Sequence, residues 1–123
     1  MATSSGDLIK SLDSPDETRP FAAHGSMAVV QLGETTIGRG TFEPGWRWSQ
    51  DVKPIAGTDS CKFHHTLYVL SGRMGVRMDD GAEFEVGPGD AAVIPPGHDA
   101  WTVGDEACVV IDTTGVARYA KPS

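Results

Sequence analysis

Residues 59–72, DSCKFHHTLYVLSG, form a strand-like run that opens with several residues able to bind a metal ion. The run holds one of the two cysteines and two of the four histidines of the chain. Side chains two or four positions apart lie on one face of a strand, so a regular strand would turn Asp59, Cys61 and His65 the same way. A carboxylate, a thiol and an imidazole on one face are suitable ligands for a transition metal ion. The run therefore predicts a strand and a candidate metal site.

Short runs of the same kind follow one another from Met27 onwards. They are rich in apolar and β-branched residues, and the segments between them are rich in glycine and proline. The runs span residues 27–32, 35–42, 46–52, 62–70, 73–78, 82–86, 90–94, 100–103 and 107–113. Asp80 and Gly81, between two of them, predict a tight hairpin because both residues tolerate positive φ. Many short strands without a long helical period predict an all-β fold, an antiparallel sandwich or a small barrel.

The length of 123 residues fits one domain. Residues 1–26 lack the strand pattern and predict an irregular N-terminal arm, whereas residues 27–123 predict the β domain. The arm has neither the basic start nor the apolar core of a secretory signal. No apolar run reaches the roughly 20 residues of a membrane-spanning helix. We therefore expect a cytoplasmic protein without a membrane partner.

Two cysteines without a secretory signal predict reduced thiols. A disulfide between Cys61 and Cys108 stays open as an alternative, because spacing along the chain does not define their separation in space.

The charge of the chain argues against nucleic acid as a partner. The formal net charge is −7 at pH 7, and Lys and Arg form no cluster. A phosphate backbone is repelled by such a surface. The chain also has no nucleophile elbow, phosphate-binding loop, dinucleotide-binding glycine motif or CxxC pair. These absences argue against several enzyme classes.

The second half of the chain resembles the cupins, a family of small antiparallel jelly-roll barrels. The second cupin motif reads Gly, five residues, Pro-x-Gly, two residues, His, three residues, Asn. Residues 89–97, GDAAVIPPG, supply both glycines and the proline at the expected spacing. Ala100 and Gly104 stand at the His and Asn positions. His98 precedes the His position by two residues, on the same face of a strand.

Residues 59–72 keep the spacing of the first cupin motif, but the residue types at its ligand positions differ. The motif reads His-x-His, three or four residues, Glu, six residues, Gly. Counted back from Gly72, the Glu position holds His65, and the two His positions hold Cys61 and Asp59. Lys53 stands where the motif opens with glycine. The resemblance thus places Asp59, Cys61 and His65 at ligand positions of the family.

The resemblance spans about residues 34–114 and implies a jelly-roll fold. Cupins include enzymes, sugar binders, regulators and storage proteins, so the activity does not follow from the fold. More narrowly, the chain looks like a group of small bacterial single-domain cupins of unassigned function, in which the cysteine and the second histidine would form the site pair. Cupins of this kind often pair through strands or an exchanged N-terminal arm, which implies a homodimer.

Each candidate ligand has a structural alternative. Cys61 could be a buried inert thiol, since free cysteine packs as a small apolar residue. His65 should point inward and His64 outward, because neighbouring strand residues face opposite sides. His98 is either a third ligand or a turn residue bonded to backbone. Asp59 is either a ligand or part of an Asx turn.

Three aromatic residues are candidates to line a ligand pocket, namely Trp48, Tyr68 and Trp101. An aromatic body with a polar tip suits a small organic ligand. The alternative is packing in the core or at the rim of a small barrel.

The sequence therefore predicts a metal-binding cupin that holds one divalent transition metal ion and a small organic ligand in its barrel. Thiolate and imidazole ligands favour Zn²⁺, with Fe²⁺, Ni²⁺ or Cu²⁺ as alternatives. Such an ion suits Lewis-acid catalysis of the isomerase, lyase or dioxygenase type, and no residue is assigned a catalytic role. The alternative function is a metal-free module that binds or senses a small metabolite.

Overall fold

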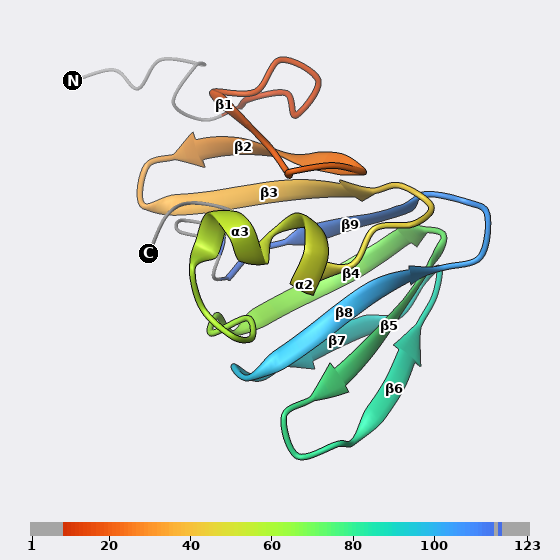
Figure 1. Cartoon of the computed structure of the whole chain (residues 1–123). Helices are drawn as coiled ribbons and strands as arrows, with labels where there is room; N and C mark the ends of the chain where they lie inside the picture. Colours follow the sequence, from red (N-terminus) through yellow and green to blue (C-terminus); the bar gives the residue numbers. More distant parts are fainter. Residues whose placement is uncertain (1–8, 115, 117–123) are drawn as a thin grey trace.

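The protein folds into two antiparallel sheets, which a computed structural model describes for residues 9–114 and 116. The strands are β1 (Glu17–Pro20), β2 (Gly25–Leu32), β3 (Thr35–Phe42), β4 (His65–Ser71), β5 (Arg73–Met78), β6 (Glu83–Val86), β7 (Ala91–Ile94), β8 (His98–Val103) and β9 (Cys108–Asp112). Six of them form a sheet in the order β1-β2-β3-β9-β4-β7, and three form a sheet in the order β6-β5-β8 (Figure 1). The all-β prediction is confirmed.

Both sheets contribute side chains to one hydrophobic core. Along β9, for example, Cys108, Val110 and Asp112 are buried, and the residues between them are less so. In the described residues no strand ladder joins the two sheets, so they form an open jelly roll. The first residues of β4 and β8 and the last residue of β9 are all buried in the space between the sheets.

Gly72 is where the chain passes from β4 in the larger sheet to β5 in the smaller one. Its φ is 73°, a conformation that favours glycine. A Cβ atom at this position would lie 2.2 Å from the backbone oxygen of Ala107. The glycine that ends the first motif is therefore required by the crossing of the chain.

The hairpin predicted at Asp80 and Gly81 is confirmed. It joins β5 to β6, and the Gly81 amide donates to the carbonyl of Met78 at 2.9 Å. Only the glycine of the pair takes positive φ, at 94°.

Residues 46–52, predicted as a strand, contain the whole of the short helix α2 (Trp48–Asp51), and α3 (Lys53–Ala56) follows (Figure 1). The strand prediction is wrong here. Trp48, Val52 and Ala56 are buried and lie four residues apart, which is the spacing of one helical face. The Asp51 carboxylate also accepts a hydrogen bond from the amide of Arg47 at 3.0 Å, at the start of α2.

The N-terminal arm predicted for residues 1–26 is not irregular throughout. Within it β1 pairs with β2, Arg19 standing opposite Met27. Phe21 is buried and stacks on Phe42 with ring centroids 5.3 Å apart. A four-residue strand that contains a proline is too short for alternation to reveal it. None of the helices in the described residues is long and apolar enough to cross a membrane.

Candidate metal centre

Three buried side chains with ligand atoms meet inside the jelly roll: Cys61, His65 and His98. Their ligand atoms all lie within 4.8 Å of one another. His65 is the first residue of β4, in the larger sheet, and His98 is the first residue of β8, in the smaller one. The cluster thus joins the two sheets at the end where β4 and β8 begin.

Backbone pairing with His98, not a regular strand, positions Cys61. The two residues form an isolated antiparallel bridge, in which the amide of Cys61 donates to the carbonyl of His98 at 2.8 Å. The amide of Gly97 in turn donates to the carbonyl of Cys61 at 2.7 Å. The strand predicted from Lys62 begins only at His65. The two motifs are therefore tied to each other through the backbone at the site.

The ring of His98 is oriented by the backbone of its own turn. Its Nδ1 lies 2.8 Å from the carbonyl oxygen of Pro95. Since a carbonyl only accepts hydrogen bonds, Nδ1 must carry a proton, and in the neutral ring Nε2 then has the lone pair that a metal ion needs. His98 can therefore bond the backbone of its turn through Nδ1 and bind a metal ion through Nε2.

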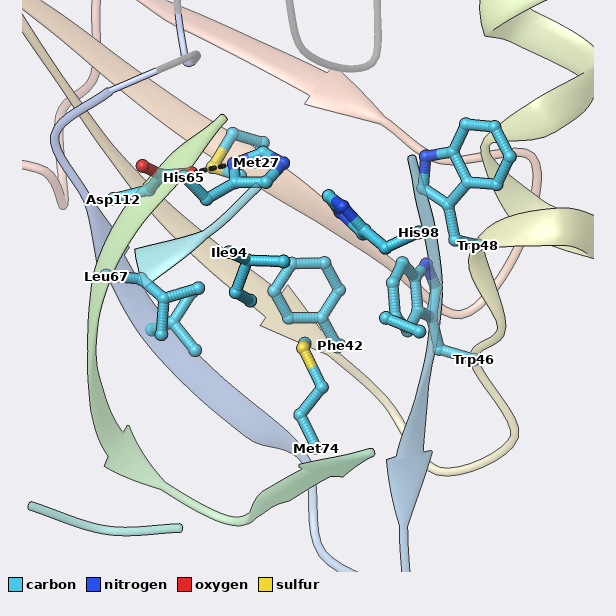
Figure 2. Close-up of a pocket in the computed structure, with 12 residues that line it drawn as sticks. Met27, Phe42, Trp46, Trp48, His65, Leu67, Met74, Ile94, His98 and Asp112 are labelled. Atoms are coloured by element: carbon cyan, nitrogen blue, oxygen red, sulfur yellow. Dashed lines mark hydrogen bonds and ion pairs between the residues drawn. The ribbon is translucent and has the colours of Figure 1, made fainter. Parts of the chain in front are cut away.

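The ring of His65 is held at both nitrogens. Nε2 lies 3.4 Å from the sulfur of Cys61. Nδ1 lies 2.6 Å from Oδ2 of Asp112, a contact drawn in Figure 2. Asp112 is buried at the end of β9. A carboxylate behind a histidine ligand fixes the orientation of the ring and makes it a stronger ligand.

Asp112 was not among the predicted site residues, although a signal was present in the sequence. Residues 108–112 read CVVID, and alternation from the apolar Cys108 and Val110 turns the next alternate residue, Asp112, toward the core. An aspartate at a core-facing position is rare unless it has a partner. The partner could not be found without the fold.

The pKa values of Cys61 and His65 are shifted in opposite directions inside the cluster. Burial raises the pKa of the Cys61 thiol, but hydrogen bonds to His65 and His98 and the charges of both rings outweigh it and lower the pKa to about 6. Burial lowers the pKa of His65, but the hydrogen bonds to Asp112 and Cys61 outweigh it and raise the pKa to about 9. By contrast, burial raises the pKa of Cys108 to about 11. Of the two cysteines, only Cys61 is prepared to be a thiolate near neutral pH.

Asp59 does not join the cluster. Its side chain is fully exposed, and the ammonium of Lys53 lies 3.9 Å from its carboxylate. The prediction that Asp59 faces inward assumed a regular strand, and the chain before Cys61 is a turn. His64 is exposed, as alternation predicts. Cys61 and Cys108 are both free thiols.

A cavity opens beside two of the three candidate ligands, His65 and His98 (Figure 2). Its volume is about 390 Å³, counted with the part of its mouth that is open to solvent. It is lined by Met27, Phe42, Trp46, Trp48, His65, Leu67, Met74, Ile94, His98, Ala100, Val110 and Asp112. The strands place most of these residues on inward positions of both sheets, so the cavity is the middle of the jelly roll.

Of the three aromatic residues predicted to line the pocket, only Trp48 does so. Tyr68 points outward from β4 and is 47% exposed. Trp101 alternates with the buried Ala100 and Thr102 and lies under the guanidinium of Arg47, 4.9 Å from the ring centroid. The predictions for Tyr68 and Trp101 are wrong, because both take outward strand positions.

The sequence of residues 11–108 matches the model of a family described as AraC-binding-like domains. No curated protein matches the chain.

Several solved structures have a similar fold. The polyketide cyclase RemF from Streptomyces resistomycificus is 22% identical, with 86% of this chain and 77% of that chain covered and a TM-score of 0.63. A double-stranded β-helix protein from Klebsiella pneumoniae is 22% identical over 86% and 87% of the two chains, with a TM-score of 0.57. An RmlC-like cupin from Shewanella frigidimarina is 19% identical over 80% and 81%, with a TM-score of 0.56. At these identities the likeness concerns the fold, and it confirms the jelly roll.

Proposed function

The chain belongs to the family of AraC-binding-like domains, a cupin-type family, and we propose that its jelly roll binds one divalent transition metal ion at Cys61, His65 and His98. The observation that carries the proposal is the convergence of three buried ligand atoms within 4.8 Å of one another. Each residue is held there by a different part of the fold. Ionisable side chains are seldom buried together in a core, so their convergence favours a binding site.

The donor set fits a zinc-type ion. One thiolate and two imidazoles are borderline-soft ligands, which Zn²⁺ prefers, and Fe²⁺, Ni²⁺ and Cu²⁺ are the alternatives. Three protein ligands leave a position for water or for an oxygen of an organic ligand. An ion bound there would act as a Lewis acid on that oxygen, which suits an isomerase or lyase type of reaction, and a redox-active ion such as Fe²⁺ would suit a dioxygenase type.

The residues of the chain prepare this site in three ways. The lowered pKa of Cys61 supplies a thiolate at neutral pH. Asp112 orients His65 so that its Nε2 faces the cluster. Apolar walls next to the ligands lower the local polarity, which strengthens electrostatic interactions inside the cavity.

A metal-free binding module is the second candidate. The hydrogen bonds that join Cys61, His65 and Asp112 satisfy these groups without an ion, so the pocket could hold a metabolite by itself. The second motif also lacks the histidine and asparagine of the family pattern, at Ala100 and Gly104.

Elemental analysis of the purified full chain separates the two candidates, with Cys61→Ala and Cys108→Ala as matched variants. Both cysteines are buried and free, and only Cys61 is in the cluster. We expect about one transition metal ion per chain in the parent and in Cys108→Ala, and much less in Cys61→Ala. Equal metal content in the two variants would remove Cys61 from the site.

Cobalt substitution provides an independent spectroscopic test. A thiolate ligand gives an intense thiolate-to-cobalt absorption, which we expect in the parent and in Cys108→Ala. A metal-free module predicts that no such band forms at one equivalent of cobalt.

A further inference from the structure

The walls of the cavity indicate which ligands it can hold. Of its twelve lining residues, all but His65, His98 and Asp112 are apolar or aromatic. The lining contains no lysine and no arginine among the described residues. Apart from the ion itself, a phosphate or a dicarboxylate would therefore find no lysine or arginine to replace the hydration of its further charges.

The polar groups of the lining offer few acceptors to a ligand. Both carboxylate oxygens of Asp112 are in use, Oδ2 with His65 at 2.6 Å and Oδ1 with the amide of Thr114 at 3.0 Å. The Nδ1 of His98 is bonded to the carbonyl of Pro95. A sugar or another polyol would bury several hydroxyl groups that need acceptors, each at a cost.

Two indole N–H groups in the lining are unused donors. Nε1 of Trp46 is fully buried and has no hydrogen-bond partner within the described part of the chain. Trp48 is also buried, and its indole nitrogen lies on the edge of the ring that faces His98 (Figure 2). Unlike Trp46 Nε1, that nitrogen is not one of the fully buried unpaired atoms within residues 9–114 and 116, so it is the indole donor that water or a ligand can reach. A fully buried indole N–H usually has a partner, so the unpaired Trp46 is unusual, and the accessible N–H of Trp48 is the donor that a ligand oxygen could use.

We infer that the cavity takes a small, uncharged, mostly hydrocarbon molecule with a carbonyl or similar oxygen, such as an aromatic ketone. Its body packs against the apolar walls, and its oxygen accepts a hydrogen bond from Trp48 beside the metal ligands. The inference rests on the proposed function, because this oxygen would lie at the open position of the ion. It adds the class of ligand, which the three metal ligands do not specify.

Isothermal titration of the zinc-loaded full chain tests the inference with three probes. Acetophenone has a ring and one carbonyl, ethylbenzene has a similar body without an acceptor, and L-arabinose is a polyol. We expect acetophenone to bind more tightly than ethylbenzene, and L-arabinose not to bind. Tighter binding of L-arabinose than of acetophenone would overturn the inference.

Trp48→Phe and Trp101→Phe form a matched pair, since both remove an indole N–H and only Trp48 lines the cavity. We expect Trp48→Phe to weaken acetophenone about two- to tenfold, the range for one lost hydrogen bond, with ethylbenzene unchanged. Trp101→Phe should leave both affinities as they are. Trp46→Phe is the second cavity variant if Trp48→Phe does not fold. Unchanged acetophenone affinity in the cavity variant would contradict the inference.

Zinc content, measured on the same samples, separates this failure from failure of the proposed function. A sample with one zinc ion per chain that does not bind acetophenone overturns the ligand class alone. A sample that binds no zinc overturns the metal site, whatever its affinity for acetophenone.

Discussion

Asp112 is the residue whose role became visible only in the folded chain. It lies 2.6 Å from Nδ1 of His65 and is 2% exposed. The motif spacing that identified Cys61 and His65 offered no reason to look at the last strand. Its carboxylate supports a ligand and does not itself join the cluster.

The substitution Asp112→Asn keeps the size of the side chain and removes its charge. We expect zinc affinity to fall about 10- to 100-fold, the usual effect of losing a carboxylate behind a histidine ligand. Competition with a chelator measures the affinity. Asp51→Asn is the matched control, because Asp51 is also buried and contacts His24 at 3.1 Å, away from the cluster. Equal losses in both variants would assign Asp112 a structural role only.

The shifted pKa values of Cys61 and His65 both stabilise the metal-free protein, but their contributions depend on pH in opposite directions. The lowered pKa of Cys61 contributes stability that is complete above pH 9 and is lost as the pH falls through about 6. The raised pKa of His65 contributes stability that is complete below pH 6.5 and is lost as the pH rises through about 9. Between pH 6.5 and 9 the two contributions therefore change in opposite directions and offset each other.

Cys61→Ala should remove one of these contributions and leave the other. Asp112 still holds the pKa of His65 above its ordinary value in that variant. We expect the free energy of unfolding of chelator-treated Cys61→Ala to decrease from pH 6.5 to 9 relative to that of Cys108→Ala. Urea denaturation at several pH values measures the difference. Parallel profiles of the two variants would show that the thiolate–imidazolium pair does not form.

Gly72 allows the chain to cross from β4 in one sheet to β5 in the other. A side chain at Gly72 meets both an unfavourable φ of 73° and a backbone oxygen at 2.2 Å. Gly81 in the β5–β6 hairpin also has positive φ, at 94°, and a Cβ atom added there would meet nothing within 4 Å. A side chain at Gly81 would therefore cause backbone strain alone, whereas a side chain at Gly72 would cause both backbone strain and steric overlap.

Gly81→Ala should destabilise the protein by about 1–2 kcal/mol, the cost of a non-glycine residue at positive φ. Gly72→Ala should cost more, because the chain must also move away from Ala107. Thermal or urea unfolding of the two variants measures the free energies of unfolding. A smaller effect at Gly72 than at Gly81 would contradict the tight crossing.

The whole molecule should be more stable with its ion than without it, because the ligands come from segments that only the fold brings together. At a free zinc concentration about 100 times the Kd, the gain in unfolding free energy is about 2.7 kcal/mol. For a domain of this size, the melting temperature should fall on the order of 10 °C when a chelator is added. Differential scanning calorimetry measures this shift. Cys61→Ala should respond much less than the parent, and Cys108→Ala should respond like the parent.

Much of the fold could be predicted from local patterns. Short alternating runs and the turns between them predicted eight of the strands, and the spacing from Gly72 selected His65 over His64. The errors have local causes. The strand prediction for residues 46–52 rests on their apolar content, whereas the buried residues there follow helical spacing. The strand β1 is too short to show alternation.

Local sequence patterns were enough to define the all-β class, the jelly-roll resemblance and the positions of Cys61, His65 and His98 as candidates, because motif spacing and strand alternation act over a few residues. The folded chain selected which candidates meet. It brought Cys61 to His98 through a backbone bridge, placed Asp112 behind His65, and left Asp59 in solvent. It also turned Trp48 inward and Trp101 outward. These outcomes depend on contacts between distant segments, and the pairing of distant segments is not encoded in any local pattern.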